Sequence, residues 1–441
     1  MKLIDYECIR AGGGGSSARL VAFGEFAGKA GMIGGLRGLG LRLLSLGHST
    51  PLLSVAPAHA YADYAEACRG LAAVGSRITA EGLPTCHSPL VIGIAGTGNV
   101  ARGAAHALNA LGAEAVRWVS ADELAPLVAQ AQACAHASSS EYRRCIYACV
   151  LEPHHLVQPR APDGEAAQGE VAHGDAAHGD AAHGDAAHGE AERRFDKAAY
   201  YARPESFESI FFHRYAPHLS MLVTAMYWDR RYPRLLSRAQ LGALGRGRAP
   251  GGAPDGASGG APDGGSDGGC DGASGGLHES SSLAGGRHLL AVADLTCDVR
   301  GAVEGLVRTS SLDAPYYVYS PDTDAEAASL DEPGVLMLGV DILPAELPRE
   351  ASQHFGDALM PYAPLLATPA HSRPAPLPPE LAHATIADQG VLAQPCTPLD
   401  RHTRRGVLRK RPKTFGSARR GGRLGHTAPP DTRPLQAHAP F

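Results

Sequence analysis

A glycine-rich turn is the segment whose residue types and spacing point most directly to chemistry. The run Gly96–Ala101 (GTGNVA) fits the pattern G-x-G-x-x-A and stands between the apolar run Pro89–Ile94 and a predicted helix. Gly96 permits a tight turn, Gly98 lets the backbone approach a pyrophosphate, and Ala101 allows close packing of helix on strand. The free amides of the helix N-terminus would face the phosphates. We therefore predict a dinucleotide site rather than a plain glycine turn. Its expected phosphate contacts are Gly96, Thr97, Gly98, Asn99 and Val100.

The end of the second predicted strand bears on which nicotinamide cofactor such a site takes. The strand Ala115–Val119 ends in Ser120, with Asp122 two residues on. NAD sites commonly place a carboxylate at the end of this strand for the ribose 2′-hydroxyl. Ser120 has no charge to repel a 2′-phosphate, and Arg117 could supply a cation. These residues favour NADP(H), with NAD(H) possible. The alternative is that Ser120 and Asp122 cap the helix predicted over Glu123–Gln132.

Further polar candidates stand after a later strand and near the amino end. Asp294 and Asp298 follow the apolar run LLAVAD, and ligands of open α/β sheets lie outside the carboxyl ends of the strands. We expect both to line the site, with solvent-exposed loop carboxylates as the alternative. Glu7 and Arg19 would suit a zwitterionic amino acid, the first facing an ammonium and the second a carboxylate, unless they form a surface ion pair. His48 is an acid/base candidate or a plain loop histidine.

Histidine and cysteine spacings do not predict a metal site. A five-residue repeat over residues 161–192 carries regularly spaced histidines, but each unit also brings glycine and a well-hydrated carboxylate. Cys145 and Cys149, with His154 and His155 nearby, match no standard zinc spacing. The repeated histidines are His173, His178, His183 and His188.

Composition limits the foldable part of the chain and excludes some classes of protein. Of 441 residues, 54 are glycine and 33 proline, yet 44% are hydrophobic, which allows a sizeable core. A net charge of -5 at pH 7 excludes a globally basic nucleic-acid protein. No apolar stretch reaches the roughly 18–20 residues of a membrane span, and the amino end lacks the apolar region of a secretory signal. We therefore expect no membrane partners. A cytoplasmic or mitochondrial location is implied by the family resemblance given below.

The remaining sequence alternates predicted strands and helices. Buried strands are predicted at Pro89–Ile94, Ala115–Val119, Leu289–Asp294 and Val335–Val340, a shorter strand at Arg19–Phe23, and helices at Gly28–Leu46, Tyr61–Val74 and Ala101–Leu111. This pattern predicts an α/β fold with a doubly wound parallel sheet of the Rossmann type. The remnant of a second α/β domain, the substrate domain, is implied by the family resemblance given below.

The predicted domains follow from these elements and from the biased segments. The expected boundaries are 1–88 for the substrate-domain remnant and linker helix, 89–344 for the dinucleotide-binding domain, 345–366 for a helix returning to the first domain, and 367–441 for a disordered, basic, proline-rich tail. Disordered insertions are expected at about 161–192 and 246–286. The tail is read as solvated, with an RNA- or DNA-binding arm as the lesser alternative.

Several long blocks in order resemble the lysine-ketoglutarate reductase region of the bifunctional aminoadipic semialdehyde synthases. That family is related to the lysine-forming saccharopine dehydrogenases and to the alanine dehydrogenase/transhydrogenase group. The blocks are LIDYE (3–7), RLVAFGEFAGKAGMI (19–33), GLGLRLLSLGHSTP (38–51), PLVIGIAGTGNVARGA (89–104), FDKAAYYARPESF (195–207), MYWDRRYPRLLS (226–237), ADLTCDVRGAVE (293–304) and VDILPAELPREASQHFGDALMPY (340–362).

The resemblance implies an activity and places residues in roles. It implies reductive condensation of L-lysine with 2-oxoglutarate by NADPH to give saccharopine. By resemblance, Glu7 and Asp298 are catalytic candidates and Arg19 and Phe23 are substrate-binding candidates. The glycine turn, Ser120 and Asp294 would contact the cofactor, and a homo-oligomer is possible. No metal is implied.

The amino end of the sequence differs from the family in a way that bears on the expected activity. In the family, a segment with a Lys and His acid/base pair precedes the LIDYE block, whereas this chain starts at Met1 just before it. We therefore expect weak or no reductase activity from the chain alone. The alternatives are an alanine dehydrogenase-like enzyme and a non-catalytic nucleotide-binding module.

Overall fold

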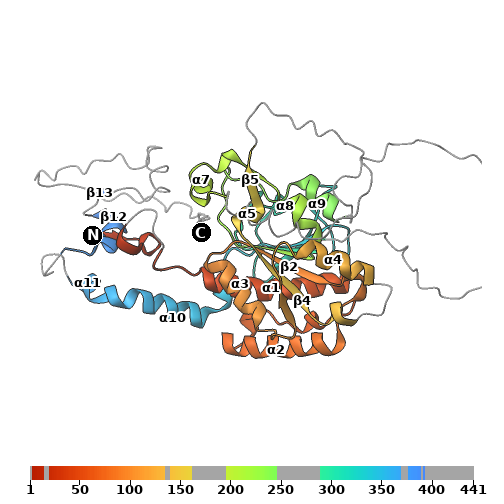
Figure 1. Cartoon of the computed structure of the whole chain (residues 1–441). Coiled ribbons are helices and arrows are strands. Elements are labelled where there is room, and N and C mark those ends of the chain that lie inside the picture. Colours follow the sequence, from red (N-terminus) through yellow and green to blue (C-terminus); the bar gives the residue numbers. More distant parts are fainter. Residues whose placement is uncertain are drawn as a thin grey trace, which may run out of the picture. The chain divides into compact units, whose positions relative to one another are not determined.

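A mostly parallel sheet organises the larger part of the protein (Figure 1). The computed structural model describes residues 2–13, 19–134, 140–160, 195–245, 289–368, 376–388 and 391–392, so both expected insertions lie outside it. The chain divides into two compact units. One runs from Phe23 to Gln353, and the other combines Met1–Ala22 with the segment from His354 onward. The larger unit thus includes the long helix that we had assigned to the first domain.

The sheet of the larger unit has eight strands among the described residues, in the order β10-β9-β11-β8-β7-β2-β4-β3. The strands from β3 to β11 in this order are parallel, while β9 and β10 are antiparallel at one edge. The bounds are β2 (Leu90–Ala95), β3 (Val116–Trp118), β4 (Ile146–Leu151), β7 (Met221–Thr224), β8 (Ala291–Asp294), β9 (Tyr316–Ser320), β10 (Ala325–Glu326) and β11 (Val335–Leu338). The predicted apolar strands are confirmed, and so is the doubly wound fold class.

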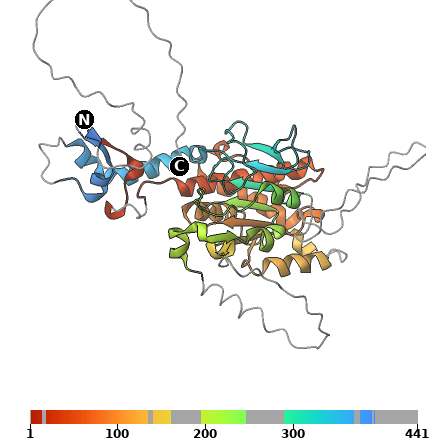
Figure 2. The same cartoon turned by 90° about the horizontal axis from the view of Figure 1, so that it is seen from above.

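Helices cover both faces of this sheet because successive strand residues point to opposite sides. Along β2, Leu90, Ile92 and Ile94 pack in one cluster, and Val91 and Ala95 pack in the other. The first cluster includes α1 (Gly24–Ser45), α2 (Tyr64–Glu81) and α3 (Asn99–Asn109), and the second includes α4 (Leu124–Ala133), α8 (Phe211–Arg214) and α9 (Arg238–Gly245). Figure 1 shows α1–α3 on one side of the strands and α8 and α9 on the other. Figure 2 shows the teal strands near one edge of the sheet and the segments around α4 near the other.

Helix α1 approaches α3 closely enough to require glycine. A Cβ placed on Gly28 would lie 1.9 Å from the carbonyl oxygen of Val100, and one on Gly103 would lie 2.0 Å from the carbonyl oxygen of Glu25. The small residues of α1 therefore serve backbone-to-backbone packing against the helix that follows the glycine turn.

The strand order differs from the sequence of strands along the chain at one point that matters for the site. Strand β4 pairs with β2 over its whole length, from Leu90↔Ile146 to Ala95↔Leu151, and β3 pairs only with β4. The second strand in sequence is therefore an edge strand and does not lie beside β2. The strand order is set by tertiary packing, because no local sequence pattern specifies which strands pair.

The smaller unit is built from both ends of the described chain. Strand β1 (Lys2–Ile4) pairs antiparallel with β12 (Thr385–Asp388), which pairs with β13 (Val391–Leu392). Leu381 and Ala384 are fully buried in the core of this unit. The expectation of disorder from residue 367 is therefore wrong for residues 376–388, because apolar residues there complete a core. The predicted strand Arg19–Phe23 is also wrong, since Arg19 forms only an isolated bridge with Arg10.

The other elements are short. Helix α10 begins at Pro348, within the segment 345–366 for which a helix was predicted. Among the described helices, none has both the length and the apolar character of a transmembrane span. The remaining bounds are α5 (Pro153–Leu156), α7 (Lys197–Ala202), α10 (Pro348–Leu359), α11 (Ala363–Ala367), α12 (Pro379–His383), β5 (Val157–Pro159) and β6 (Phe207–Ser209).

Candidate dinucleotide site

The glycine turn leaves the carboxyl end of β2 in a conformation that only glycine adopts easily. Gly96 has φ +122°, and its N–H donates to the carbonyl of Leu151 at the end of β4 (3.0 Å). A Cβ at Gly96 would lie 2.4 Å from the carbonyl oxygen of Ala225, just after β7. The turn is therefore wedged between the ends of the two strands that flank β2, which is the position of ligand crevices in doubly wound sheets.

The second glycine opens onto free space. Gly98 is the N-cap residue of α3, it is exposed, and a Cβ built on it would meet no atom within 4 Å. No side chain caps the N-terminus of α3. Thr97 and Asn99 are exposed and Val100 is half-buried, so the turn presents backbone amides and small groups. This open cradle at a helix N-terminus fits a pyrophosphate.

Asp294, the last residue of β8, is fully buried and satisfied on one oxygen only. Its Oδ1 accepts hydrogen bonds from the hydroxyls of Thr224 and Thr296, both 2.6 Å away, and from the Thr296 N–H at 3.1 Å. Oδ2 is buried without a hydrogen-bond partner among the described residues. Burial raises the pKa of Asp294 above its usual range. Oδ2 is therefore the oxygen of this carboxyl group that is left for a further hydrogen-bond partner.

Asp298 lies in the loop after β8 and is half-buried. Burial, followed by the neighbouring charges of Asp294 and Asp229, raises its pKa to about 6. Cys297 beside it has a positive φ of 56°, and burial raises the pKa of its thiol, so this cysteine is a protonated thiol at neutral pH. The loop thus presents one carboxyl group that titrates close to neutrality.

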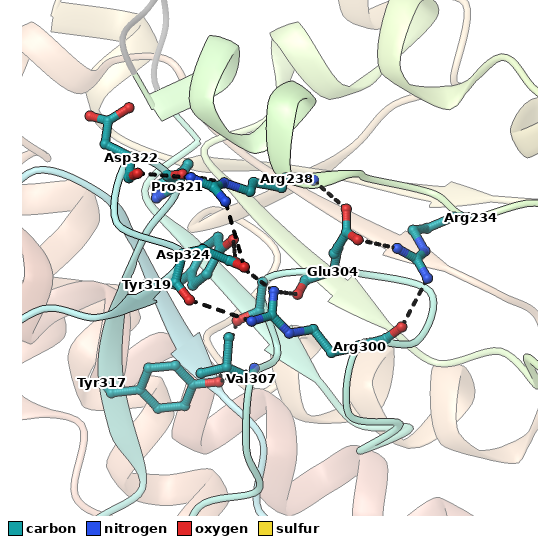
Figure 3. A network of polar contacts seen from close by, with 11 residues as sticks. Arg234, Arg238, Arg300, Glu304, Val307, Tyr317, Tyr319, Pro321, Asp322 and Asp324 are labelled. Carbon is teal, nitrogen blue, oxygen red and sulfur yellow. Dashed lines mark hydrogen bonds and ion pairs between the residues drawn. The ribbon is translucent and has the colours of Figure 1, made fainter.

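A network of charged residues holds the far part of this loop (Figure 3). Arg300 donates to Asp324 Oδ1 at 2.6 Å, and the hydroxyl of Tyr319 donates to the same oxygen at 2.6 Å. Glu304 pairs with Arg234 at 2.5 Å and accepts from the Arg238 N–H at 2.7 Å. These contacts tie residues 300–304 to β9 and to the start of α9, so the loop that carries Asp298 is anchored at its carboxyl-terminal side.

The order of the strands changes which residue lies beside the glycine turn, where the adenosine ribose is expected. Ser120 follows the edge strand β3, and its N–H and hydroxyl both donate to Glu123 Oε2 at 2.6 and 2.9 Å. The residue that follows β4, the strand beside the glycine turn, is Glu152, whose side chain is exposed. Glu152 comes directly after Leu151, the residue whose carbonyl accepts from Gly96. The carboxylate missing from the second strand in sequence is therefore present at the end of the strand that neighbours β2 in space.

Glu7 and Arg19 lie in the smaller unit. The Glu7 N–H donates to Asp5 Oδ1 (3.0 Å) in a short 3-10 helix, Tyr6–Cys8. Burial and the charges of Glu7 and Asp5 raise the pKa of Tyr6, while the charge of Arg19 opposes this shift. The charges of Glu7 and Arg19 therefore both influence the pKa of Tyr6, in opposite directions. Phe23, in the larger unit, is the N-cap residue of α1, and its carbonyl accepts from Phe26 and Ala27.

Sequence reasoning missed some polar groups at the carboxyl edge of the sheet. Thr224 ends β7, Thr296 follows β8, and Glu152 follows β4. The signal for Thr224 and Glu152 was in the sequence, since each comes at the end of an apolar run, but β4 and β7 had not been predicted as strands.

Comparison with known proteins finds relatives over most of the chain. An alpha-aminoadipic semialdehyde synthase of Arabidopsis thaliana is 31% identical over 391 residues, covering 88% of this chain and 30% of that protein. The mitochondrial alpha-aminoadipic semialdehyde synthase of Bos taurus is 30% identical over 362 residues, covering 82% of this chain and 32% of that protein. The chain thus spans about a third of the length of the curated relatives it matches. No family model matches.

Among solved structures, an L-alanine dehydrogenase aligns with 89% of this chain and 66% of its own, with a TM-score of 0.39 and 14% sequence identity.

Proposed function

Because the chain is homologous over most of its length to part of the alpha-aminoadipic semialdehyde synthases, as its sequence blocks predicted, we propose that it is a pyridine-nucleotide-dependent reductase unit of lysine degradation. The proposed reaction is the condensation of L-lysine with 2-oxoglutarate and reduction to saccharopine. The observation that carries the proposal is the open cradle at Gly98, set at the carboxyl edge of the sheet.

The residues present fit a nicotinamide dinucleotide. The amides of the glycine turn and of the first turn of α3 would hold the pyrophosphate. Oδ2 of Asp294, which has no hydrogen-bond partner among the described residues, would form a hydrogen bond with the nicotinamide half, since β8 lies on the opposite side of β2 from β4. The cofactor supplies a hydride when bound.

Glu152 bears on the choice between NAD(H) and NADP(H). We had favoured NADP(H) because Ser120 carries no charge. The sheet order instead sets Glu152 at the end of the strand beside the glycine turn, where a carboxylate accepts from a ribose 2′-hydroxyl and repels a 2′-phosphate. For this chain we therefore propose a preference for NAD(H).

The chemistry of condensation needs a group that moves protons near neutral pH. The ε-amine of lysine, with a pKa of about 10.4 in water, attacks the keto carbon only after it loses a proton. The carbinolamine then loses water to give the imine, which takes up the hydride and a proton. Asp298, with a pKa of about 6, is the carboxyl group of the larger unit suited to these transfers. Glu7 and Arg19 are proposed to contact the ammonium and a carboxylate of the substrates.

Fluorescence titration with NADH and NADPH tests nucleotide binding, and a turnover assay with lysine and 2-oxoglutarate tests the reaction. Gly98→Val is the sharpest variant, because its side chain enters open space and so leaves the fold intact while it fills the phosphate cradle. We expect nucleotide binding by the parent chain and its loss in Gly98→Val at an unchanged melting temperature. Equal nucleotide binding by the parent protein and by Gly98→Val would refute the proposed phosphate site. Turnover with pyruvate and ammonia in place of lysine and 2-oxoglutarate would point to an alanine dehydrogenase-like enzyme instead.

A further inference from the structure

A cluster of nitrogen and sulfur ligands lies near the amino end of β2, whereas the dinucleotide site lies at its carboxyl end. His48 follows α1, and Cys86 and His87 belong to a 3-10 helix, Thr85–His87, that precedes β2. The glycine turn comes after β2, so a strand of six residues, about 20 Å long, separates the two places. The cluster therefore has no part in holding the dinucleotide.

The distances in this cluster match those between the ligands of one metal ion. Cys86 Sγ lies 3.4 Å from His48 Nε2 and 3.7 Å from His48 Nδ1. One ligand atom from each of the three residues lies within 4.8 Å of the others. With Zn–S bonds of about 2.3 Å and Zn–N bonds of about 2.0–2.1 Å, two ligands of a tetrahedral zinc ion lie about 3.6 Å apart. The sulfur and the His48 ring are already at that separation.

Backbone hydrogen bonds fix the main chain at both histidines of the cluster. The His48 N–H donates to Leu43 at the end of α1 (2.9 Å), and the His87 N–H donates to Pro84 (3.2 Å). The rings of His48 and His87 meet edge to face, with centroids 5.0 Å apart. Little ordering of the main chain would therefore accompany binding, and small rotations of the side chains would bring the third ligand in.

We propose that His48, Cys86 and His87 bind a zinc ion, with the fourth position open to water. One thiolate and two imidazoles are a donor set that zinc favours. Cys86 is a free, exposed cysteine and both histidines are half-buried, which leaves the ion a path to solvent. The ion would link the segment after the carboxyl end of α1 to the segment before the amino end of β2. Its role is to stabilise the larger unit, since metal binding to the folded state adds to folding free energy.

Cobalt(II) is the probe that reports the sulfur ligand, because a thiolate bound to Co²⁺ gives a near-ultraviolet charge-transfer band. The parent for the experiment is the full chain with His173, His178, His183 and His188 replaced by serine, which removes the repeat histidines as competing ligands. We expect the thiolate band at one Co²⁺ per chain, its displacement by Zn²⁺, and a melting temperature that rises with Zn²⁺. Cys86→Ser should abolish the band, and His48→Ala and His87→Ala should each weaken binding by at least about tenfold.

Cys68→Ser is the matched control, since Cys68 is a free cysteine on α2 outside the cluster. It should keep both the band and the zinc-dependent rise in melting temperature. The melting temperature of each variant in EDTA shows that it folds as the parent does. The proposal is overturned if the parent shows no thiolate band at one equivalent of Co²⁺. Persistence of the band in Cys86→Ser, or its loss in Cys68→Ser, would overturn it equally.

Discussion

Replacement of Gly28 by alanine should damage the dinucleotide site from a position outside it. The added methyl would lie 1.9 Å from the Val100 carbonyl oxygen and 2.7 Å from the Ala104 nitrogen, both backbone atoms of α3. Ordinary contact needs about 3.4 Å, so the two helices must separate by roughly 1.5 Å. Overpacking of this kind costs about 1–3 kcal/mol or more, and alanine returns about 1 kcal/mol through its helix propensity.

Gly35→Ala is the matched control for Gly28→Ala. It makes the same change in the same buried helix, but its methyl would meet the Ala293 methyl at 3.3 Å and the movable end of Met221 at 3.4 Å. We expect Gly28→Ala to be about 2 kcal/mol less stable than Gly35→Ala, which is a difference of about 4–8 °C in melting temperature. Nucleotide affinity should fall at least about tenfold in Gly28→Ala alone, because the first turn of α3 moves with Val100.

The measurements are thermal melts followed by circular dichroism and fluorescence titration with the preferred nucleotide. If the two variants have the same melting temperature and the same affinity, the contact between α1 and α3 does not set the position of the phosphate-binding amides, and the reasoning fails.

Other substitutions test the remaining groups of the site. Glu152→Gln should shift the NADH/NADPH affinity ratio toward NADPH by about tenfold or more, whereas Glu123→Gln, at the N-cap of α4, should leave it unchanged. No shift in Glu152→Gln would refute its assignment to the ribose. Asp294→Asn keeps the acceptor for both threonine hydroxyls and puts an amide N–H in place of the unpartnered Oδ2, so we expect near-parent stability and binding, while Asp294→Ala should lose about 3 kcal/mol in denaturant melts. Asp298 has its pKa raised to about 6, above its ordinary 3.8, so the folded state holds the proton longer and its contribution to stability declines as pH rises from about 4 to 6. Melting curves across that range should show a smaller decline for Asp298→Asn, and identical pH profiles would contradict the shift.

The elements that could be predicted are those whose signal is local. Strands β2 and β8 are uninterrupted apolar runs, and the glycine turn follows β2 with the spacing that a phosphate cradle needs. Asp294 could be placed at the carboxyl edge because it ends such a run. Its fully buried state and its paired threonines could not, since they depend on the neighbouring strand β7.

What could not be predicted depends on which segments become neighbours. Nothing local shows that β4 inserts between β2 and β3, so that Glu152, and not Ser120, follows the strand beside β2. The zinc cluster joins residues 38 positions apart in sequence, too far for any ligand-spacing pattern. Residues 376–388 had been merged with the basic tail because their apolar residues find a core only against the amino end.

The pairing of β1 with β12 has a consequence for synthesis of the chain. Lys2 lies opposite Asp388, so β1 is synthesised before the larger unit and its partner strand β12 is synthesised after it. The smaller unit can form only after the entire larger unit has been translated, and loop-closure entropy then opposes the joining of its halves. Premature termination anywhere before residue 385 would release a polypeptide in which β1 lacks this partner strand, however well its Rossmann sheet had folded.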